Sequence, residues 1–246
     1  MRTLNGLRIL NTRPLEQGLV LSEQIHQAGG IAISCPLIAI NSLSNTLLPD
    51  LHQLNLAIFI SANAVELCCQ QLTRQKLIWP EHIHVIAIGQ GTANSLAKHH
   101  IHVHELPDSP QSEHLLTLLE SQSWQQKQVA LFKGEGGRPV IEEYLHKQQA
   151  KLHVVTLYQR VLPALDRQFL HSLWRDDAVD IILLTSAQAI QHLFLLFDPS
   201  EHPWLTSKTG LVLSERLAQI AKAAGFKKII ISHPNQIIDS LFDYKD

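Results

Sequence analysis

Short apolar runs alternate along the chain with longer stretches in which apolar residues recur every three or four positions. The first pattern is typical of buried strands and the second of amphipathic helices. The apolar runs predict strands over Arg8–Asn11, Ala32–Cys35, Leu56–Ser61, Val85–Ile88, His102–Glu105, Val129–Lys133, His153–Leu157, Asp180–Thr185, Gly210–Leu213 and Lys228–Ser232. Helices are expected over Glu16–Ala28, Asn63–Gln71, Thr92–His99, Ser112–Ser121, Pro139–Gln149, Ala187–Phe197, Glu215–Ala224 and Asn235–Phe242. This alternation predicts an α/β fold with parallel sheets.

The two halves of the chain resemble each other over three strand–turn units. The matched pairs are Leu10–Arg13 with Leu131–Gly134, Ile58–Val65 with Leu183–Ile190, and Val85–Gly89 with Gly210–Ser214. The offset between the members of each pair stays between 121 and 125 residues. Two similar open α/β units would leave a cleft between them, where such folds bind ligands. A looser explanation stays open, because any two α/β domains align to some degree.

Length and charge narrow the class of protein. The 246 residues suffice for two small domains, and 45% hydrophobic with 17% charged residues is ordinary for a globular chain. A formal net charge of −2 disfavours nucleic acid and the membrane surface as partners. The apolar runs are too short to span a membrane, and the first residues carry no signal-peptide pattern, so we expect a cytoplasmic protein. Three cysteines, an odd number, indicate reduced thiols.

Polar residues gather where the predicted strands end and helices begin. These turns are Asn11–Pro14, Ser61–Asn63, Gly89–Thr92, Gly134–Arg138, Ser186–Gln188 and Ser214–Arg216. Backbone N–H groups, the positive end of a helix and a capping hydroxyl together bind anions. Plain helix capping is the alternative for any single serine or threonine. Six such turns, some with a basic residue, favour an anionic ligand.

Two conspicuous motifs give weaker evidence of a binding site than these turns do. The Gly134–Arg138 turn is neither a dinucleotide fingerprint nor a phosphate loop, so it supports a nucleotide site only weakly. Its glycines allow close backbone approach to a ligand, and Arg138 and Lys133 could pair with carboxylates. In the histidine-rich stretch 99–104, His102 and His104 would share one face of a strand, but no ligand spacing surrounds them. We therefore expect a solvated edge there and no metal site.

Tyr158 ends a predicted strand and, taken alone, would be a packing residue. The chain has no Ser/His/Asp order, nucleophile elbow or carboxylate pair with identifiable roles. Residue chemistry by itself thus leaves the reaction type open.

The turns, taken in order, resemble those of the bacterial uroporphyrinogen-III synthases over nearly the whole chain. The resemblance rests on Thr12–Pro14, Cys35–Ile40, Phe59–Val65, Ala87–Ala93, Ser112–Leu116, Lys133–Arg138, Leu157–Arg160, Leu184–Ser186 and Ser214–Ala218. No single motif is specific in this variable family, but the series is.

The resemblance implies an enzyme that converts hydroxymethylbilane, a linear tetrapyrrole with eight carboxylates, into uroporphyrinogen III. The last pyrrole ring is inverted and water is lost, by way of an azafulvene and a spiro intermediate, without cofactor or metal. The implied fold is two α/β domains joined by a two-stranded ribbon. Domain one would be 1–35 with 164–246, domain two 41–157, and the ribbon 36–40 with 158–163. The repeat alone would divide the chain near residue 125 instead.

The resemblance also implies roles for individual residues. Tyr158 resembles the tyrosine that hydrogen-bonds the leaving hydroxyl, and Thr92 resembles a cleft threonine. The implied substrate-binding residues are Arg13, Ser61, Asn63, Gly91, Lys133, Gly134, Gly137, Arg138, Ser186 and Ser214. The turn at Ser214 lacks the small hydroxyl that Thr92 provides in its counterpart, which puts an equivalent role there in doubt.

The expected partner is the small-molecule tetrapyrrole alone. We expect a monomer that makes transient contact with the enzyme supplying hydroxymethylbilane. The alternative from another class is a two-lobed binding or sensor protein for an anionic small molecule. A nucleotide-sugar transferase would need a longer chain and a clearer nucleotide-binding turn.

Overall fold

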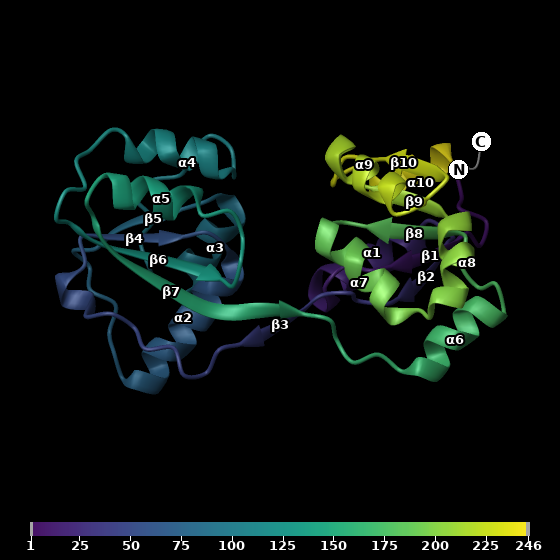
Figure 1. Ribbon diagram of the computed structural model, residues 1–246, viewed down its shortest axis with the longest axis horizontal. Coiled ribbons are helices and arrows are strands. Elements are labelled where there is room, and N and C mark those ends of the chain that lie inside the picture. Colours follow the sequence, from purple (N-terminus) through teal and green to yellow (C-terminus); the bar gives the residue numbers. More distant parts are fainter. Residues whose placement is uncertain (1, 245–246) are drawn as a thin grey trace. The chain divides into compact units, whose positions relative to one another are not determined.

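The computed structural model describes residues 2–244 as two compact units (Figure 1). Unit 1 holds the chain up to Ala39 and again from Val161, and unit 2 is Ile40–Arg160. Each unit is an α/β fold around a sheet of five strands, which confirms the predicted fold class. The expected domain bounds and the two-stranded ribbon between the domains stay predictions.

Unit 1 is built on a parallel sheet in the order β10-β9-β8-β1-β2. Its strands are β1 (Arg8–Asn11), β2 (Ile31–Ser34), β8 (Ile181–Leu184), β9 (Thr209–Val212) and β10 (Lys228–Ile231). Its helices are α1 (Leu15–Gln27), α6 (Arg167–Arg175), α7 (Ala187–Leu196), α8 (His202–Ser207), α9 (Glu215–Ala223) and α10 (Ile237–Asp243), with a 3-10 turn at Pro199–Glu201. Strand β8 alternates between two cores: Ile181 and Leu183 face α1 and α10, whereas Ile182 and Leu184 face α7 and α9.

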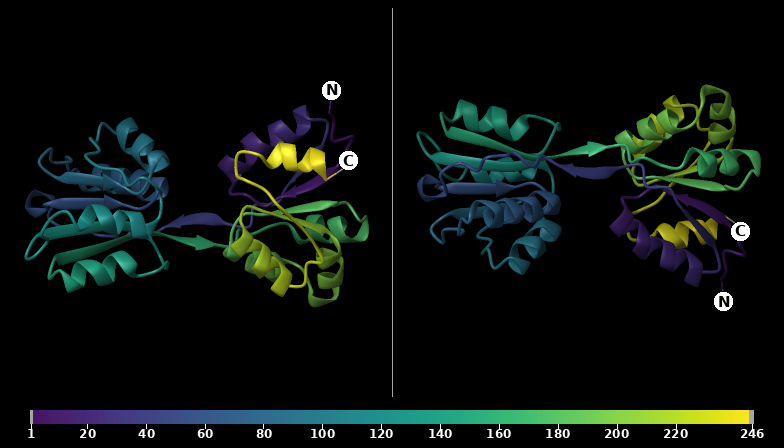
Figure 2. Two further views of the ribbon diagram at one scale, coloured as in Figure 1. Left: turned by 90° about the horizontal axis from the view of Figure 1, so that it is seen from above. Right: turned by 90° about the horizontal axis from the view of Figure 1, so that it is seen from below.

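Unit 2 repeats this plan in the order β3-β7-β6-β4-β5. Its strands are β3 (Ala39–Ser42), β4 (Leu56–Phe59), β5 (His84–Ala87), β6 (Gln128–Gly134) and β7 (Lys151–Val161). Its helices are α2 (Ala62–Gln75), α3 (Gln90–Lys98), α4 (Ser112–Leu119) and α5 (Val140–Lys147), with a 3-10 turn at Leu51–Gln53. Strands β4 to β7 pair in parallel, and Figure 2 shows β3 running opposite to its neighbour β7. Ala57 and Phe59 pack toward α2 and α3, and Leu56 and Ile58 toward α4 and α5.

The strand orders confirm the internal repeat. Strands β7, β6, β4 and β5 of unit 2 occupy the places of β2, β1, β8 and β9 in unit 1. The equivalence extends to single pairs, because the bridge between Ile86 and Glu105 stands where Leu211 pairs with Ile230.

One match in the repeat is wrong by a single residue. Ile9 pairs with Ile181, and Val129 pairs with Leu56 at the same place in the other sheet. Ile9 is therefore equivalent to Val129, which makes Arg13 the counterpart of Lys133 rather than of Gly134. Both units thus carry a basic residue at the carboxyl end of the same inner strand.

The strand expected over His102–Glu105 does not form. Only Glu105 bridges to β5, and the side chain of His104 is the reason. Its Nδ1 accepts the hydrogen bond of the Val85 backbone N–H at 3.0 Å, the donor that a continuing ladder would need. Helices α6 and α8 were not expected as elements, and β3 overlaps the ribbon segment expected at 36–40 only in part, whereas the other bounds agree within a few residues.

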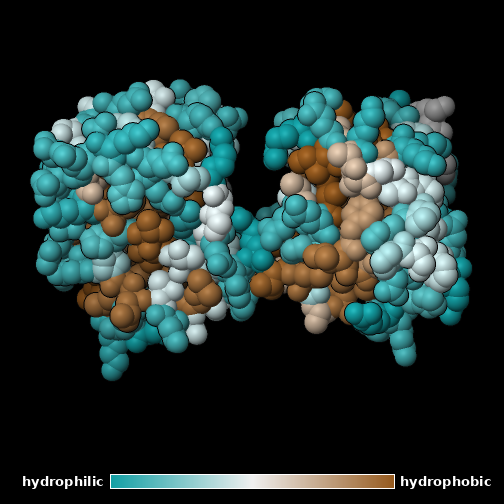
Figure 3. Space-filling view, in the orientation of Figure 1, coloured by the Kyte–Doolittle hydropathy of each residue, from teal (hydrophilic) through white to brown (hydrophobic). Residues whose placement is uncertain are grey.

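On the face that Figure 3 shows, hydrophilic residues alternate with apolar patches in both units. Exposed large apolar side chains include Ile78 and Leu47 in unit 2 and Leu195 in unit 1. Within residues 2–244, no helix is long and apolar enough to cross a membrane. All three cysteines are free thiols, as predicted, and burial raises the pKa of Cys35 to about 12.

Candidate functional site

The six polar turns follow the carboxyl ends of β1, β4, β5, β6, β8 and β9, as predicted. Three of them contain a serine that caps the next helix in the same way. Ser61 Oγ accepts the N–H of Ala64 at 3.1 Å, and Ser186 Oγ accepts that of Ala189 at 3.0 Å. Ser214 caps α9 by accepting the N–H of Leu217 at 3.3 Å. The capping alternative therefore holds for all three serines, and any ligand contact would come in addition to it.

Tyr158 lies inside β7 and does not end it, contrary to the sequence interpretation. The pairing of β6 with β7 shifts between Lys133 and Gly134, so that Lys133 pairs with Thr156 and Gly134 with Tyr158. Such an irregularity breaks the alternation of side chains along a strand. As a result Leu157 and Tyr158 both join the core on the α2 and α3 side, and Tyr158 is 1% exposed.

Gly134 leaves room for the ring of Tyr158 because it has no side chain. A Cβ at Gly134 would lie 2.5 Å from two ring carbons of Tyr158, so the ring lies directly against this glycine. The hydroxyl thereby passes β6 and reaches the turn after β4, where it is 3.0 Å from Ser61 Oγ. Because neighbouring strands are about 4.8 Å apart, this hydrogen bond links β7 to the turn after β4 across the width of β6. Gly134 thus allows the close approach of Tyr158, and its expected contact with a ligand stays a prediction.

Arg160 stands two residues further along β7, on the same side as Tyr158. Its Nη2 lies 3.4 Å from the Tyr158 hydroxyl, and its Cζ lies 5.6 Å from the centre of the ring. Sequence reasoning missed Arg160, although the spacing Tyr-x-Arg in a strand is the signal that could have identified it. Tyr158, Ser61, Gly134 and Arg160 form one contact cluster, which we call the tyrosine cluster.

Two of the three cations expected to bind carboxylates already hold a carboxylate of the protein. Lys133 is 7% exposed and pairs with Glu142 of α5. Arg138 is exposed and grips Glu113 of α4 through two hydrogen bonds, which keeps the pKa of that carboxyl below its usual range. A substrate carboxylate at either cation would have to compete with its internal partner.

Arg13 differs from both. Among the residues described, its Nε is the one buried side-chain nitrogen or oxygen without a hydrogen-bond partner. Burial lowers the pKa of its guanidinium from the ordinary value. The turn around it is held by Asn11, whose Oδ1 accepts the N–H of Arg13 at 3.3 Å and whose Nδ2 donates to the Gly18 carbonyl at 2.9 Å. An unpaired donor on a half-buried cation is suited to an anion, which would offset the lost hydration.

The remaining candidates belong to the turns without entering the tyrosine cluster. Thr92 is buried in the first turn of α3, where its N–H donates to the Gly89 carbonyl at 3.0 Å, and Gly91 beside it is exposed. Asn63 is exposed in the first turn of α2. Gly137 is exposed with a φ of +89°, a conformation that favours glycine.

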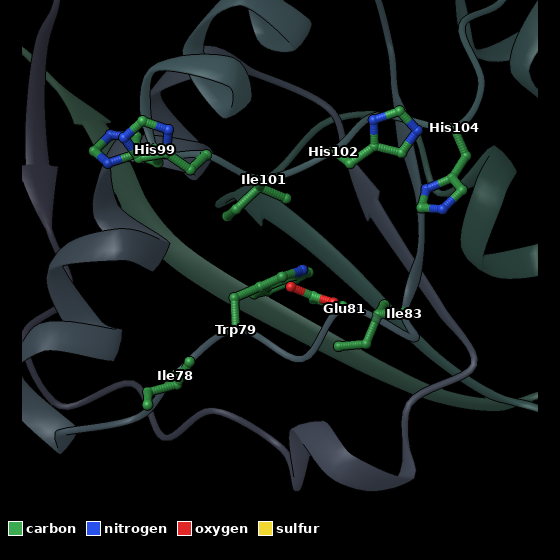
Figure 4. A pocket seen from close by; sticks show the side chains of 9 residues that line it. Ile78, Trp79, Glu81, Ile83, His99, Ile101, His102 and His104 are labelled. Atoms are coloured by element: carbon green, nitrogen blue, oxygen red, sulfur yellow. The ribbon is translucent and has the colours of Figure 1, made fainter.

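The histidine-rich stretch lies outside the tyrosine cluster, around a pocket of its own (Figure 4). Trp79, Ile83 and Ile101 line this pocket together with His102 and His104. The rings of His102 and His104 contact each other with centroids 4.7 Å apart. In the part of the chain that the structure describes, no three His, Cys, Asp or Glu side chains are grouped to hold a metal ion. None of the twelve candidate site residues lines this pocket.

The tyrosine cluster contains the chemistry of a weak acid. A phenol with hydrogen-bonding neighbours can hand a proton to a departing oxygen, and nearby donors stabilise the anion left behind. The turns supply backbone N–H groups and, at Arg13, a guanidinium whose Nε has no partner, for carboxylates. In chemical terms, the tyrosine cluster of unit 2 fits a reaction that needs a proton at one oxygen, and the turns of each unit, taken separately, fit an anionic ligand.

Comparison with known proteins identifies the family to which the sequence is similar. A family model described as uroporphyrinogen-III synthase HemD matches residues 20–243. The uroporphyrinogen-III synthase of Salmonella typhimurium is 31% identical over 237 residues, covering 92% of this chain and 95% of the relative. The enzyme of the same name from Escherichia coli has the same identity and coverage.

Solved structures share the fold. A uroporphyrinogen III synthase mutant from Thermus thermophilus superimposes with a TM-score of 0.63 at 14% identity, covering 98% of both chains. The enzyme from Helicobacter pylori gives a TM-score of 0.62 at 16% identity, again covering 98% of both chains.

Proposed function

Because the chain belongs to the uroporphyrinogen-III synthase family, we propose that the tyrosine cluster and the polar turns after the strands of both units take part in its reaction. The protein is a lyase of tetrapyrrole biosynthesis that cyclises hydroxymethylbilane to uroporphyrinogen III, with inversion of the last pyrrole ring and loss of water. Nothing in the comparisons supports the alternative of a binding or sensor protein.

Tyr158 is the acid in this proposal. As the C–O bond of the hydroxymethyl group breaks, its electron pair passes to the oxygen, and the lone pair of the pyrrole nitrogen supplies the carbon. The oxygen takes the phenolic proton of Tyr158 and leaves as water. The observation that supports this role most directly is the hydroxyl of Tyr158 beside Ser61, at the carboxyl edge of a parallel sheet, where α/β folds bind ligands.

Thr92 and the turns hold the substrate in the conformation that lets the last ring turn over. Thr92 lies in the first turn of α3, which follows the edge strand β5, so this turn and the turn at Ser61 lie at the same end of parallel strands. The substrate carboxylates contact the turns that contain Ser61, Asn63, Gly91, Lys133, Gly134, Gly137, Arg138, Ser186 and Ser214. Fixing a reactive conformation is itself a large catalytic contribution, so no strong acid–base pair is needed.

Arg13 is the side chain best placed to bind a substrate carboxylate. We expect Arg13→Gln to raise KM about tenfold or more with little change in kcat, because a hydrogen bond to a charged group contributes roughly 1.5–3 kcal/mol. The matched variant Arg138→Gln should raise KM less than about threefold, since the exposed Arg138 is already paired with Glu113. Steady-state kinetics of both variants test this, and a larger effect at Arg138 would contradict the ranking.

The proposal also covers the location, oligomeric state and partners of the protein. The protein works as a cytoplasmic monomer without cofactor or metal, and takes its unstable substrate by transient contact with the enzyme that supplies it. This setting extends what the family resemblance implies.

The direct test is the ring isomer of the product. The purified protein, given freshly generated hydroxymethylbilane and no added metal or nucleotide, should yield mainly the type III isomer after oxidation and chromatography. Spontaneous closure without enzyme gives type I. Type I product alone at saturating protein would refute the assignment, and loss of activity with a chelator would show that a metal takes part.

A further inference from the structure

The hydrogen bond between Ser61 and Tyr158 fixes where the proton of Tyr158 can go. Each hydroxyl carries one proton and two lone pairs. Ser61 Oγ uses one lone pair to accept the N–H of Ala64, and it lies 3.0 Å from Tyr158 Oη. If Tyr158 donates in this bond, its only proton is held inside the protein. If Ser61 donates, the proton of Tyr158 stays available to a ligand.

Arg160 contributes a second hydrogen-bond donor, and its role as donor is fixed. A guanidinium donates hydrogen bonds and never accepts them. In the contact of Arg160 Nη2 with Tyr158 Oη at 3.4 Å, the phenol oxygen is therefore the acceptor. The second lone pair of that oxygen remains for the hydroxyl of Ser61. Ser61 also sits at the start of the 14-residue helix α2, whose positive end favours negative charge nearby. Both features favour an arrangement in which Tyr158 accepts twice.

We propose that Ser61 and Arg160 are positioning residues that both donate to Tyr158 Oη and leave its proton for the departing hydroxyl of the substrate. The inference rests on the proposed role of Tyr158 as the acid. When the phenolic O–H bond breaks and water leaves, the tyrosinate is held by both donors. The tyrosinate regains a proton at the end of ring closure, when the pyrrole carbon that has formed the new C–C bond loses its hydrogen as a proton. Ser61 thus acts through Tyr158 and does not serve mainly as a substrate contact.

The sharpest test compares Ser61→Ala with Ser61→Thr, which keeps the hydroxyl and the helix cap. We expect Ser61→Ala to lower kcat about fivefold to tenfold with KM nearly unchanged, because one hydrogen bond contributes roughly 1 kcal/mol. Ser61→Thr should retain most of the wild-type kcat. Arg160→Gln should have a smaller effect than Ser61→Ala, because the contact at 3.4 Å is longer. A raised KM with wild-type kcat in Ser61→Ala would overturn the inference.

Loss of the cap itself needs a control outside the site. Asp166 caps α6 in unit 1 by accepting the N–H of Gln168 at 2.8 Å. Asp166→Ala should lower the melting temperature about as much as Ser61→Ala, without the fall in kcat. Equal losses of kcat in the two variants would mean that Ser61 acts only through stability, and would overturn the inference.

A second readout needs no substrate. The C–O stretch of a tyrosine responds differently to hydrogen bonds that the phenol accepts and donates, and isotope-edited infrared spectra resolve it. Subtracting the spectrum of Tyr158→Phe from that of the wild type isolates Tyr158 among the three tyrosines. We expect an accepting phenol in the wild type and in Ser61→Thr, and a changed band in Ser61→Ala. A donating phenol in the wild type would overturn the inference. An accepting phenol together with full activity of Tyr158→Phe would refute the catalytic role of Tyr158 alone.

Discussion

Replacing Tyr158 by phenylalanine should lower kcat for the cyclisation by about 10²-fold while leaving KM within a few fold of the wild-type value. General-acid assistance contributes roughly 10²–10⁴-fold, and the hydroxyl of an electron-rich pyrrole leaves easily, which places this case at the lower end. The proton is needed as charge develops on the leaving oxygen, so the loss falls on turnover rather than on binding.

The substitution is well suited to the purpose because it removes a single oxygen. The ring still fills its place against Gly134, and only the hydroxyl's bond to Ser61 and its contact with Arg160 Nη2 are lost. Tyr144→Phe on α5 is the matched control, since this partly buried tyrosine lies outside the cluster. Its kcat should equal that of the wild type.

Single-turnover rates of Tyr158→Phe and Thr92→Ala, with melting temperatures, measure this prediction. Thr92→Ala should cost less in turnover than Tyr158→Phe. If Tyr158→Phe turns over at the wild-type rate while a fully folded Thr92→Ala is inactive, the acid is not Tyr158.

Much of the fold could be predicted because its signals are local. Strand β8 is buried on both faces and reads as an unbroken apolar run, and the serine caps mark where α2, α7 and α9 begin. Helix α6 was missed although Asp166 caps it and Leu170 and Leu173 pack into the core at helical spacing. The strand expected at His102 to Glu105 failed because a side chain, that of His104, took a backbone donor, which no periodicity reveals.

The candidate site, like the fold, has features that the sequence predicts and features that it does not. Its place at the carboxyl ends of the strands follows from topology and was predictable. The orientation of Tyr158 was not, because alternation after Val155 and Leu157 would turn it to the opposite face. Only the shifted pairing at Gly134 brings it to Ser61. The internal partners of Lys133 and Arg138 likewise depend on helix packing, which one sequence does not encode in any short motif.

Gly134 should therefore tolerate substitution poorly, even though its backbone is not in the left-handed region. In Gly134→Ala the new methyl group would lie 2.5 Å from the Tyr158 ring, and both residues are buried. Relieving such an overlap in a packed core costs about 1–3 kcal/mol in the free energy of unfolding. The displaced hydroxyl should also lower kcat, by up to roughly 10²-fold, because misplacement by about 1 Å can cost that much.

Two comparisons isolate the cause in thermal unfolding and steady-state kinetics. Gly91→Ala, where an added Cβ meets nothing within 4 Å, should leave the melting temperature near that of the wild type. In a Tyr158→Ala background the ring is gone, so adding Gly134→Ala should cost little further stability, and the pair should show a coupling free energy of about 1 kcal/mol or more. Strictly additive losses would mean that Gly134 is required for a reason other than the ring of Tyr158. The path by which that ring reaches Ser61 would then need another explanation.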